Sequence, residues 1–479
     1  MDAGNNHRFK MLEAIRSRAA LEAKNDVHQN STNTAIIDNS GQVGPGTNVG
    51  ILVPNGYLYV VYTIAIWLSG SAVVPLSLMH VKSELGYFIT NSNCSAVLTF
   101  SEQTELLSSI SQEHNSDFKI FLPDLTASDS DLPPFVDHYS GKPKGVVSSH
   151  KNIVSQVESL KEAWGITQND RLLHVMPLHH THGIVVALYS MLYSAGTTEL
   201  MPKFSVTGVI NRVVNGERNL TLFMGVPTMY ALLLKKTEGY SESEMEAFKY
   251  GFSQFRLTIS GSSPLQISLF NGWEKATSQV MVERYGMSEI GMALSNSGSD
   301  PTQRFPGCVG KPLPNVSVRL VDEAGVDVTN DPNTSGEVQI KGDTVFKRFK
   351  TGDIGTRSSD GIYRLLGRNS TDIIKSGGYK LSSIELEQHV LENPSVNQIS
   401  IVAVPDPVLQ FVPGAAVVFN STNPPRSSQS LIDDLKAWCT KEMSAYKVPK
   451  YFVAVEELPV NLMRKVDKKR VLLMFNDSA

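Results

Sequence analysis

The stretch Arg284-Tyr-Gly-Met-Ser-Glu289 places an aromatic ring, a flexible glycine, a hydroxyl and a carboxylate within six residues. Taken alone, it is also the pattern of a helix that begins with Ser-Glu near its cap. Four further short motifs lie before and after it: Tyr139-Ser-Gly-Lys-Pro-Lys-Gly145, Thr351-Gly-Asp353, Leu366-Gly-Arg368 and Lys465. Their fixed order over most of the chain is more informative than any one of them.

The residues around this stretch predict an α/β protein. Short apolar runs, typical of buried strands, alternate with patterns of helical period, and this alternation indicates layered, largely parallel sheets. We expect strands at residues 49–53, 96–100, 171–176, 221–224 and 256–259, and helices at 153–164 and 227–235.

The local composition of the sequence changes after Pro306. Glycine, valine and turn dipeptides become frequent there, which predicts a β-rich subdomain. From Lys380 the pattern indicates a small α+β unit, with helices at 382–392 and 431–443 and strands at 398–404 and 415–419. We therefore expect an N-terminal domain at 1–367, with the β-rich subdomain at about 306–367, and a small C-terminal domain at 368–479.

Composition limits the function classes. The chain has 479 residues, more than one typical domain, and its net charge of −4 offers no basic surface field for nucleic acid. Cys94, Cys308 and Cys439 lie far apart and form no CxxC pair. That arrangement disfavours a disulfide framework or a zinc knuckle and fits a reducing compartment.

The uncharged stretch at residues 57–79 is long enough to span a bilayer, but Ser69-Gly70 and Pro75 interrupt it. We expect instead a buried helix that ends near Leu68, a core strand at 72–74 and no membrane span. The N-terminus lacks the apolar core of a signal peptide, and its acidic residues argue against a mitochondrial presequence. The expected compartment is the cytoplasm, with the mitochondrial matrix as the alternative.

In their order, the five motifs resemble the AMP-forming adenylating superfamily of acyl-CoA synthetases, luciferases and peptide-synthetase adenylation domains. The resemblance covers nearly the whole chain. It implies a large N-terminal region of α/β layers with a β-rich subdomain, and a small mobile α+β C-terminal domain. It also implies ATP, Mg²⁺, coenzyme A and a small carboxylic acid, because adenylation gives a poorly electrophilic carboxylate a good leaving group before a thiol attacks.

Ser140, Gly141, Lys144 and Gly145 resemble the end of the family's phosphate loop, in which small residues let backbone N–H groups surround the phosphates of ATP. The family has a longer Ser/Thr/Gly-rich stretch before this point, so several residues are absent here. In isolation the segment is also a Pro/Gly turn with two solvated lysines. It is not a Walker A loop, since no GxxxxGK[ST] occurs in the chain.

Two segments of this chain resemble the segments that contact adenine in the family. Gly261 and Ser262 lie in Thr258-Ile-Ser-Gly-Ser-Ser-Pro-Leu265, which is also the pattern of an ordinary strand-ending turn. Tyr285, followed by Gly286, would stack on the adenine.

The resemblance also implies contacts to phosphate, metal and ribose. Ser288 would bind the α-phosphate, and Glu289 would hold Mg²⁺, a hard cation suited to carboxylate oxygen. Asp353 would accept hydrogen bonds from both ribose hydroxyls, as carboxylates do in other nucleotide folds, and Arg368 would join it.

His180, in Met176-Pro-Leu-His-His-Thr-His-Gly183, resembles the residue that gates the acyl pocket. A zinc site formed by His179, His180 and His182 is the alternative. We disfavour it because adjacent residues on one strand point to opposite faces and no nearby acid or cysteine completes the ligand set.

Gly225-Val-Pro-Thr-Met-Tyr230 and Glu283-Arg-Tyr-Gly-Met287 look most like malonyl- or methylmalonyl-CoA synthetases. Arg284 and Met287 would line the acid pocket, and Arg284 would hold the distal carboxylate of a dicarboxylic acid in a bidentate contact. A second arginine is expected just after Tyr230, where this chain has Ala231-Leu-Leu233.

Two C-terminal segments resemble the parts that serve the two half-reactions. Lys375, Gly377 and Gly378 would line the pantetheine tunnel for CoA once the small domain has rotated about Ser370. Lys465 would neutralise charge shared by the carboxylate and the α-phosphate. In isolation, the residues around Lys465 are also a solvated basic tail.

We expect an ATP-dependent acid–CoA ligase that forms an acyl-AMP and then an acyl-CoA, with malonate or methylmalonate as the acid. A catalytically impaired homologue that binds a nucleotide or an acyl group is the alternative, favoured by the shortened loop and by two further gaps near residues 41 and 345. A medium-chain fatty acyl-CoA ligase, a peptide-synthetase adenylation domain and a luciferase-type monooxygenase fit less well. The sequence does not indicate an oligomeric state.

Overall fold

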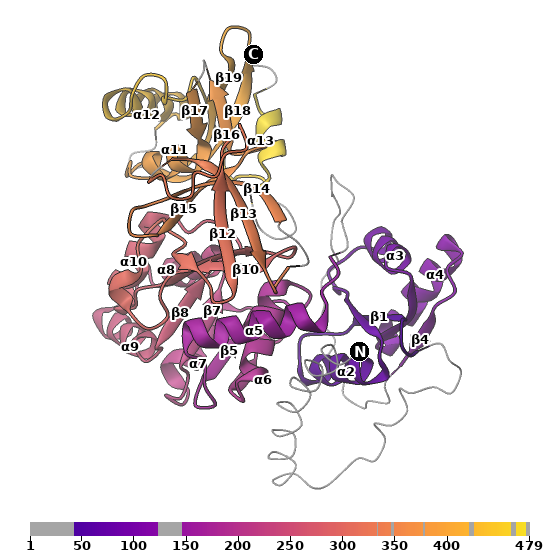
Figure 1. The fold of residues 1–479 in the computed structure, drawn as a ribbon. Helices are drawn as coiled ribbons and strands as arrows, with labels where there is room; N and C mark the ends of the chain where they lie inside the picture. Colours follow the sequence, from indigo (N-terminus) through magenta and orange to yellow (C-terminus); the bar gives the residue numbers. More distant parts are fainter. Residues whose placement is uncertain are drawn as a thin grey trace. The chain divides into compact units, whose positions relative to one another are not determined.

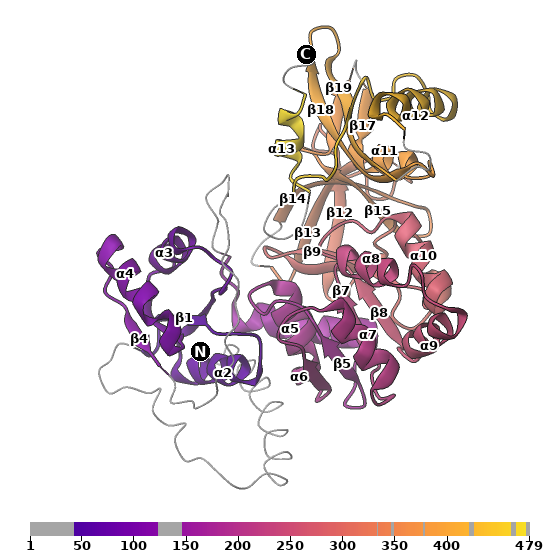
Figure 2. The same ribbon diagram turned by 180° about the vertical axis from the view of Figure 1, so that it is seen from behind.

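The computed structural model describes residues 43–122, 146–332, 334–345, 349–376, 379–420, 426–460 and 466–475. The chain forms two compact units, which we describe separately (Figure 1 and Figure 2). The first comprises Met1–Lys161, Ile166–Arg212 and Asn219–Met224. The second comprises Glu162–Gly165, Val213–Arg218 and Gly225–Ala479.

The first unit begins with a parallel sheet in the order β2-β1-β3-β4, covered on both faces by helices. Alternate residues of each strand face opposite layers. Val49 and Ile51 pack with α2, whereas Leu52 and Val97 pack with α3 and α4. These elements are β1 Asn48–Leu52, α2 Tyr57–Ser69, β2 Ala72–Pro75, α3 Lys82–Asn91, β3 Cys94–Thr99, η1 Ser101–Gln103, α4 Thr104–His114 and β4 Lys119–Phe121.

The uncharged stretch forms α2 and β2, as expected, and α2 ends where Gly70 adopts the left-handed conformation with φ 87°. In the part of the chain that the structure describes, no helix is long and apolar enough to cross a membrane. β2 differs from the expected core strand. It lies at the edge of its sheet, and its four residues are exposed or half-buried.

The rest of the first unit contains parallel strands in the order β6-β5-β7. Asp170, just before β5, ties the strands together because its carboxylate accepts hydrogen bonds from the Thr167 N–H and the Thr221 hydroxyl. The elements are α5 His150–Trp164, β5 Arg171–His174, the π-helical η2 His182–Tyr189, α6 Ser190–Tyr193, β6 Thr197–Leu200, α7 Val206–Asn215 and β7 Leu222–Gly225.

The second unit opens with β8 and β9, which are parallel, and continues into the antiparallel β10 and β11. Tyr230 of α8 packs edge-on against Trp273 of α10, and Phe248 and Phe252 of α9 complete the aromatic cluster. The elements are α8 Pro227–Lys236, α9 Glu242–Ser253, β8 Leu257–Ser260, α10 Ile267–Thr277, β9 Val282–Met287, β10 Gly291–Ser295, η3 Pro301–Gln303 and β11 Lys311–Pro312.

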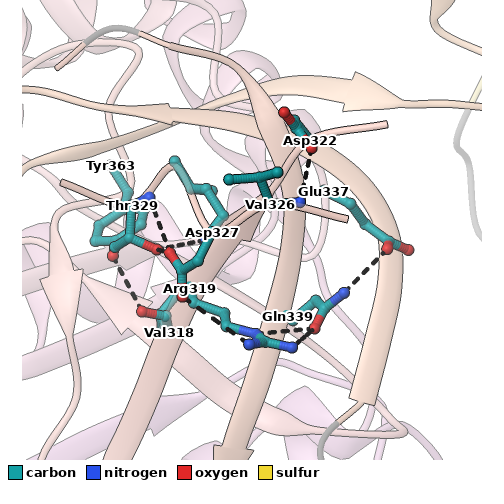
Figure 3. A network of polar contacts seen from close by, with 10 residues as sticks. Val318, Arg319, Asp322, Val326, Asp327, Thr329, Glu337, Gln339 and Tyr363 are labelled. Carbon is teal, nitrogen blue, oxygen red and sulfur yellow. Dashed lines mark hydrogen bonds and ion pairs between the residues drawn. The ribbon is translucent and has the colours of Figure 1, made fainter. Parts of the chain in front are cut away.

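An antiparallel sheet in the order β12-β13-β14-β15 follows, as the β-rich pattern after Pro306 predicts. Tyr363 on β15 donates its hydroxyl proton to the Val318 carbonyl on β12 at 3.3 Å, so the sheet curls until its outer strands approach. Figure 3 shows these two residues. The strands are β12 Val316–Val321, β13 Gly336–Gly342, β14 Phe349–Arg357 and β15 Tyr363–Arg368.

The C-terminal part contains a sheet in the order β17-β16-β19-β18, with β20 paired to β19. Ile399 and Ile401 of β18 pack with α11 and α12, whereas Val402 and Val404 pack with α13 on the other face (Figure 1). The elements are β16 Ile373–Ser376, β17 Tyr379–Ser382, α11 Ser383–Val390, β18 Val396–Asp406, β19 Gln410–Phe419, α12 Ser428–Glu442, β20 Tyr451–Ala454 and α13 Lys468–Leu473.

This mixed architecture of layered sheets, a β-rich part and a small α+β part confirms the expected fold class. The predicted strands and helices lie within a few residues of β1, β3, β5, β7, β8, α5 and α8. The domain boundary after residue 367 stays a prediction. It falls just before Arg368, the last residue of β15, and β16 begins at Ile373.

Candidate active site

In the second unit, Tyr285, Asp353 and Arg368 form one polar cluster from three different strands. The Tyr285 hydroxyl donates to Asp353 Oδ2 at 2.5 Å, and Arg368 Nε lies 3.1 Å from Asp353 Oδ1. Burial raises the pKa of Asp353, while Tyr285 and Arg368 act in the opposite direction. Each carboxylate oxygen keeps a lone pair beyond these contacts, so the cluster can still accept two further hydrogen bonds.

The local backbone explains how Asp353 is aimed. The pairing of β13 with β14 shifts between Glu337 and Gln339, so that Thr351-Gly-Asp353 bulges out of the ladder. Gly352 has φ 73°, a conformation that favours glycine. The Thr351 hydroxyl donates to the Val338 carbonyl at 2.7 Å and accepts from the Asp353 N–H at 3.0 Å. Bulges of this kind re-aim side chains next to active sites.

A polar chain on β12 and β13 supports the bulge. The Arg319 guanidinium donates to Gln339 Oε1 at 2.9 Å, Gln339 Nε2 donates to Glu337 Oε2 at 3.4 Å, and Gly352 N–H donates to Glu337 Oε1 at 3.3 Å. Figure 3 shows Arg319, Gln339 and Glu337 in line across the sheet. No local motif marks these three side chains, because β12 and β13 have the sequence pattern of ordinary structural strands.

Arg284 lies on β9 and is only 3% exposed. Its Nη2 donates to Ser262 Oγ at 3.2 Å, but its buried Nε has no hydrogen-bond acceptor among the described residues. Burial lowers the pKa of Arg284 to about 9, with Tyr230 acting in the opposite direction. A buried guanidinium with an unused donor is costly, so this geometry favours an anionic ligand.

Gly261 and Ser262, which were predicted to face the adenine, form the surface against which Arg284 packs. A Cβ atom at Gly261 would lie 2.5 Å from Arg284 Nε, so only glycine leaves room for this side chain. Ser262 adopts a left-handed conformation with φ 70°, which is unusual for serine and turns its hydroxyl toward Arg284. Contact between these residues and adenine stays a prediction.

Glu283, the neighbour of Arg284, was not among the candidate site residues predicted from the sequence. It is 4% exposed, its Oε1 accepts from the Leu265 N–H at 3.1 Å, and its buried Oε2 has no partner among the described residues. Burial raises the pKa of Glu283 to about 8, so the carboxyl is mostly protonated at neutral pH. The sequence feature that could have identified Glu283 is an acidic residue within a strand whose other residues are mostly buried.

The end of the Arg284–Glu289 motif is a turn and not the start of a helix. β9 ends at Met287, Ser288 and Glu289 are exposed, and β10 begins at Gly291. Gly286 has no room for a side chain, because a Cβ there would lie 2.2 Å from the Gly291 carbonyl oxygen. The alternative of a capped helix is therefore wrong.

The carboxylate of Glu289 is the type of ligand that the expected contact with Mg²⁺ requires. In the described parts of the chain, no group of three or more His, Cys, Asp or Glu residues could hold a metal ion. Mg²⁺ does not need such a cage, since it is usually bound through one or two carboxylates, substrate phosphates and water. An exposed carboxylate such as Glu289 suits that role.

The histidine segment belongs to the first unit and differs from the expected geometry. His179 and His180 lie in a turn before η2, and their rings approach to 4.3 Å instead of facing opposite ways. The His80 ring lies 5.8 Å from His179. Burial and the neighbouring imidazoles lower the pKa of His80 to about 4 and that of His179 to about 3. These two rings are therefore neutral at neutral pH.

Other predicted site residues are described only in part. Lys375 is exposed on β16 and lies 3.5 Å from Glu323 Oε1. Ser140, Gly141, Lys144, Gly145, Gly377, Gly378 and Lys465 lie outside the described residues. The roles predicted for all of these residues stay predictions.

Comparison with protein families gives two matches that together span most of the chain. The model of the AMP-binding enzymes matches residues 35–134 and 140–349. The model of the AMP-binding enzyme C-terminal domain matches residues 385–464. These matches confirm the resemblance that the five motifs carry.

Curated relatives and solved structures extend the match. The malonate–CoA ligase of Arabidopsis thaliana is 32% identical over 521 residues, which cover 98% of this chain and 84% of that protein. The mitochondrial malonate–CoA ligase ACSF3 of Homo sapiens is 34% identical over 487 residues, covering 90% and 83%. ATP-bound MatB from Rhodopseudomonas palustris superposes with a TM-score of 0.78 at 26% identity, covering 98% and 93%.

Proposed function

The chain belongs to the family of AMP-binding enzymes and is an ATP-dependent acyl-CoA synthetase, and we propose that its acid is malonate or methylmalonate. The acid is first joined to AMP with release of pyrophosphate. The thiol of CoA then attacks the activated carbonyl and releases AMP. ATP and CoA are substrates of the family.

The observation that supports a dicarboxylic acid is the buried Arg284. Its Nε has no acceptor among the described residues, and it makes no ion pair with any of them. A carboxylate at the distal end of the acid would supply the missing acceptor and the opposite charge. A bidentate guanidinium–carboxylate contact also fixes orientation, which would hold the other carboxylate for attack on the α-phosphate.

The names of the relatives support the same acid. The matched proteins from Arabidopsis thaliana, Xenopus laevis and Homo sapiens are malonate–CoA ligases. This chain has no arginine at Ala231-Leu-Leu233, so its pocket would hold the distal carboxylate with Arg284 and the Ser262 hydroxyl. Weaker discrimination between one and two carboxylates follows from that difference.

The remaining proposed residues divide the work of the two half-reactions. Asp353 and Arg368 would bind the ribose, Tyr285 and Gly261 the adenine, and Ser288 the α-phosphate. Glu289 would hold Mg²⁺, which when bound neutralises phosphate charge. Lys465 would stabilise the charge that builds up during adenylation, and His180 and Met287 would close the acid pocket. Lys375 and the Gly377-Gly378 turn would face CoA.

A catalytically impaired homologue is the second candidate, because the phosphate loop is shortened between Tyr139 and Gly141. The two candidates differ in one measurement. A working ligase exchanges pyrophosphate into ATP when its acid is present, whereas an impaired homologue binds ligand without exchange. The cytoplasm remains the expected compartment. The mitochondrial relatives support the mitochondrial matrix as the alternative.

The test compares the wild-type chain with Arg284→Met on malonate, methylmalonate, acetate and octanoate. We expect kcat/KM for malonate to exceed that for acetate, and Arg284→Met to lower this ratio about thirty- to a hundredfold, since a charge-assisted hydrogen bond is worth about 2–3 kcal/mol. Arg364→Met, on an exposed side chain of the same unit, is the matched control. An unchanged ratio in Arg284→Met would show that Arg284 does not bind the distal carboxylate.

A further inference from the structure

Lys468 makes two ion pairs with carboxylates that lie far from it in the sequence of the C-terminal part. Its Nζ lies 2.8 Å from Asp372 Oδ1 and 3.0 Å from Glu387 Oε1. The same ammonium donates to Ser383 Oγ at 2.6 Å. The side chains of Lys468, Asp372 and Glu387 are only 20%, 14% and 18% exposed. Such a shielded group with short contacts is much more strongly held than a surface ion pair.

The carboxylates that Lys468 contacts are themselves fixed. Asp372 Oδ2 accepts from the Arg368 N–H at 2.9 Å, and Glu387 Oε1 accepts from the Ile401 N–H at 2.7 Å. Burial lowers the pKa of Lys468, but the carboxylates of Glu387 and Asp372 together raise it by more than burial lowers it. The net shift of the pKa is therefore upward. The ammonium is therefore charged at neutral pH.

One end of this cluster lies in the residues that directly follow Lys465. Val460 pairs with Val466, and the Asp467 N–H donates to the Pro459 carbonyl at 2.8 Å, so residues 459–460 and 466–467 lie side by side. Lys468 follows directly as the first residue of α13, and Asp467 caps this helix. Lys465 is thus three residues from a side chain that is fixed by two carboxylates.

The other end holds the start of β16, the strand that contains Lys375, for which we propose a contact with CoA. Asp372 directly precedes β16, which contains Lys375, and follows the predicted hinge at Ser370 by two residues. The Asp372 carbonyl accepts from the Ser383 N–H at 2.8 Å, which ties the same residue to the start of α11. α11 and α13 cover opposite faces of the sheet, so Lys468 connects the two layers (Figure 2).

We propose that Lys468 is a positioning residue for both half-reactions, because it fixes the Val466–Lys468 segment, which directly follows Lys465 in the chain, and the Asp372–Ser376 segment to each other. The inference rests on the proposed ligase mechanism, in which these segments act in turn at the same acyl group. When the small domain rotates about Ser370, the clamp of Lys468, Asp372 and Glu387 lies wholly beyond the hinge and moves as one piece. Both segments then keep their spacing through the rotation.

The experiment compares Lys468→Met, Lys468→Arg, Lys465→Ala and the control Lys469→Met, whose exposed side chain makes no ion pair with a described residue. Adenylation is followed by pyrophosphate exchange, and thioester formation by CoA consumption from supplied malonyl-adenylate. We expect Lys468→Met to lower both rates on the order of a hundredfold, as a misplacement of about 1 Å does. Lys465→Ala should lower the first rate alone, Lys468→Arg should recover most of both, and Lys469→Met should match the wild type.

A loss in Lys468→Met that is confined to adenylation, or no loss at all, overturns the proposal. So does a folded Lys468→Arg variant that recovers neither rate. If Lys468→Met does not fold because two carboxylates are left without their cation, the variant Lys468→Met/Asp372→Asn/Glu387→Gln removes both charges. Loss of both rates in that folded variant supports the clamp, and retention of either rate overturns it.

Hydrogen–deuterium exchange separates this inference from the proposed function. A wild-type chain that exchanges no pyrophosphate with any acid refutes the function, yet the clamp can still be measured. We then expect Lys468→Met to speed amide exchange in residues 366–376 and 466–475 together, with no change in Lys469→Met. Faster exchange in one of these segments alone overturns the clamp.

Discussion

At the scale of single residues, Gly261 determines where Arg284 can lie. A Cβ at Gly261 would meet Arg284 Nε, Cζ and Cδ at 2.5, 2.6 and 2.8 Å. Gly261→Ala should therefore displace the guanidinium without removing its charge. We expect a fall of about tenfold or more in the ratio of kcat/KM for malonate to that for acetate, which corresponds to about 1.4 kcal/mol.

The matched control for this change is Gly272→Ala on α10. A Cβ there meets nothing closer than Leu234 Cδ1 at 3.5 Å, and alanine favours a helix over glycine. Thermal unfolding of both variants checks that the fold is kept. A Gly261→Ala enzyme with the wild-type ratio would contradict the positioning of Arg284 by Gly261.

Glu283 should make stability depend on pH. Its pKa is about 8 in the folded chain and near 4.5 when unfolded, so between these values the unfolded state is ionised while the folded state keeps its proton. The free energy of unfolding then falls as pH rises from about 4.5 to about 8, by up to about 1.4 kcal/mol per unit. Glu283→Gln removes this loss, so its melting temperature should exceed that of the wild type by more at pH 8 than at pH 5.

Glu274→Gln, which changes an exposed carboxylate on α10, is the control for Glu283. Melting curves of the three proteins between about pH 5 and about pH 8 provide the comparison. A constant difference between Glu283→Gln and the wild type across this range would mean that Glu283 does not titrate inside it.

The sequence indicated some site residues well and others not at all. Tyr285, Asp353 and Arg368 were expected to serve one nucleotide, and they do lie together, because Asp353 and Arg368 pair across β14 and β15 and the Tyr285 hydroxyl on β9 donates to Asp353. Lys468 lies in the segment around Lys465, for which a solvated basic tail was the alternative. Its partners lie 96 and 81 residues away in the chain, since 468 − 372 = 96 and 468 − 387 = 81. No local pattern contains that pairing.

At the scale of elements, the bulge in β14 should depend on Glu337. This carboxylate accepts from the Gly352 N–H in the conformation that aims Asp353. Gln339 donates to the carboxylate, and Arg319 donates to Gln339 (Figure 3). Glu337→Ala should loosen the bulge and raise KM for ATP about tenfold, since a hydrogen bond to a charged group contributes about 1.5–3 kcal/mol. kcat with saturating ATP should change less.

Lys341→Met is the control for Glu337, because Lys341 is exposed on the same strand β13. Steady-state kinetics with varied ATP separate KM from kcat in both variants. If Glu337→Ala lowers kcat and leaves KM for ATP unchanged, Glu337 does not act through the ribose contact.

Element boundaries were predictable where apolar periodicity was strong, and not where turns decide them. The strand expected at 398–404 extends to Asp406, and the strand expected at 415–419 starts earlier, at Gln410. The Asp406 carboxylate accepts from the N–H groups of Val408 and Leu409, and Gln410 takes φ 68°, so the strands join in a tight hairpin. That turn depends on side-chain hydrogen bonds that no periodicity reveals.

At the scale of the whole molecule, the alternation of apolar runs with helical patterns was sufficient to predict layered sheets, and the change after Pro306 predicted the antiparallel β12–β15 sheet. The histidine turn shows the limit of that approach. His179 and His180 were placed on a strand, but Leu178 N–H donates to Asn55 and Tyr59 donates to the Leu178 carbonyl, which shapes the segment as a turn. Those partners lie more than a hundred residues earlier in the chain.

Overall turnover should be limited by the shortened phosphate loop, which lies outside the described residues. Each preorganised donor lost from a transition-state site costs about 3 kcal/mol, so the loss of two would lower the rate by about four orders of magnitude if they acted independently. Lys142 and Lys144 supply charge but not the enclosing backbone N–H groups. Replacing Ser140 with Thr-Ser-Gly-Thr-Thr, between Tyr139 and Gly141, should therefore raise adenylation sharply.

The matched control replaces Ser140 with five alanines, which restores the length without hydroxyls or glycine. Pyrophosphate exchange with malonate measures the three proteins, and circular dichroism checks that each one folds. We expect exchange to rise only in the Thr-Ser-Gly-Thr-Thr variant, because backbone N–H groups surround phosphate only where small residues let the loop turn sharply. Fast exchange by the unchanged chain would mean that other donors already enclose the phosphates, and an equal rise with alanine would mean that loop length alone is limiting.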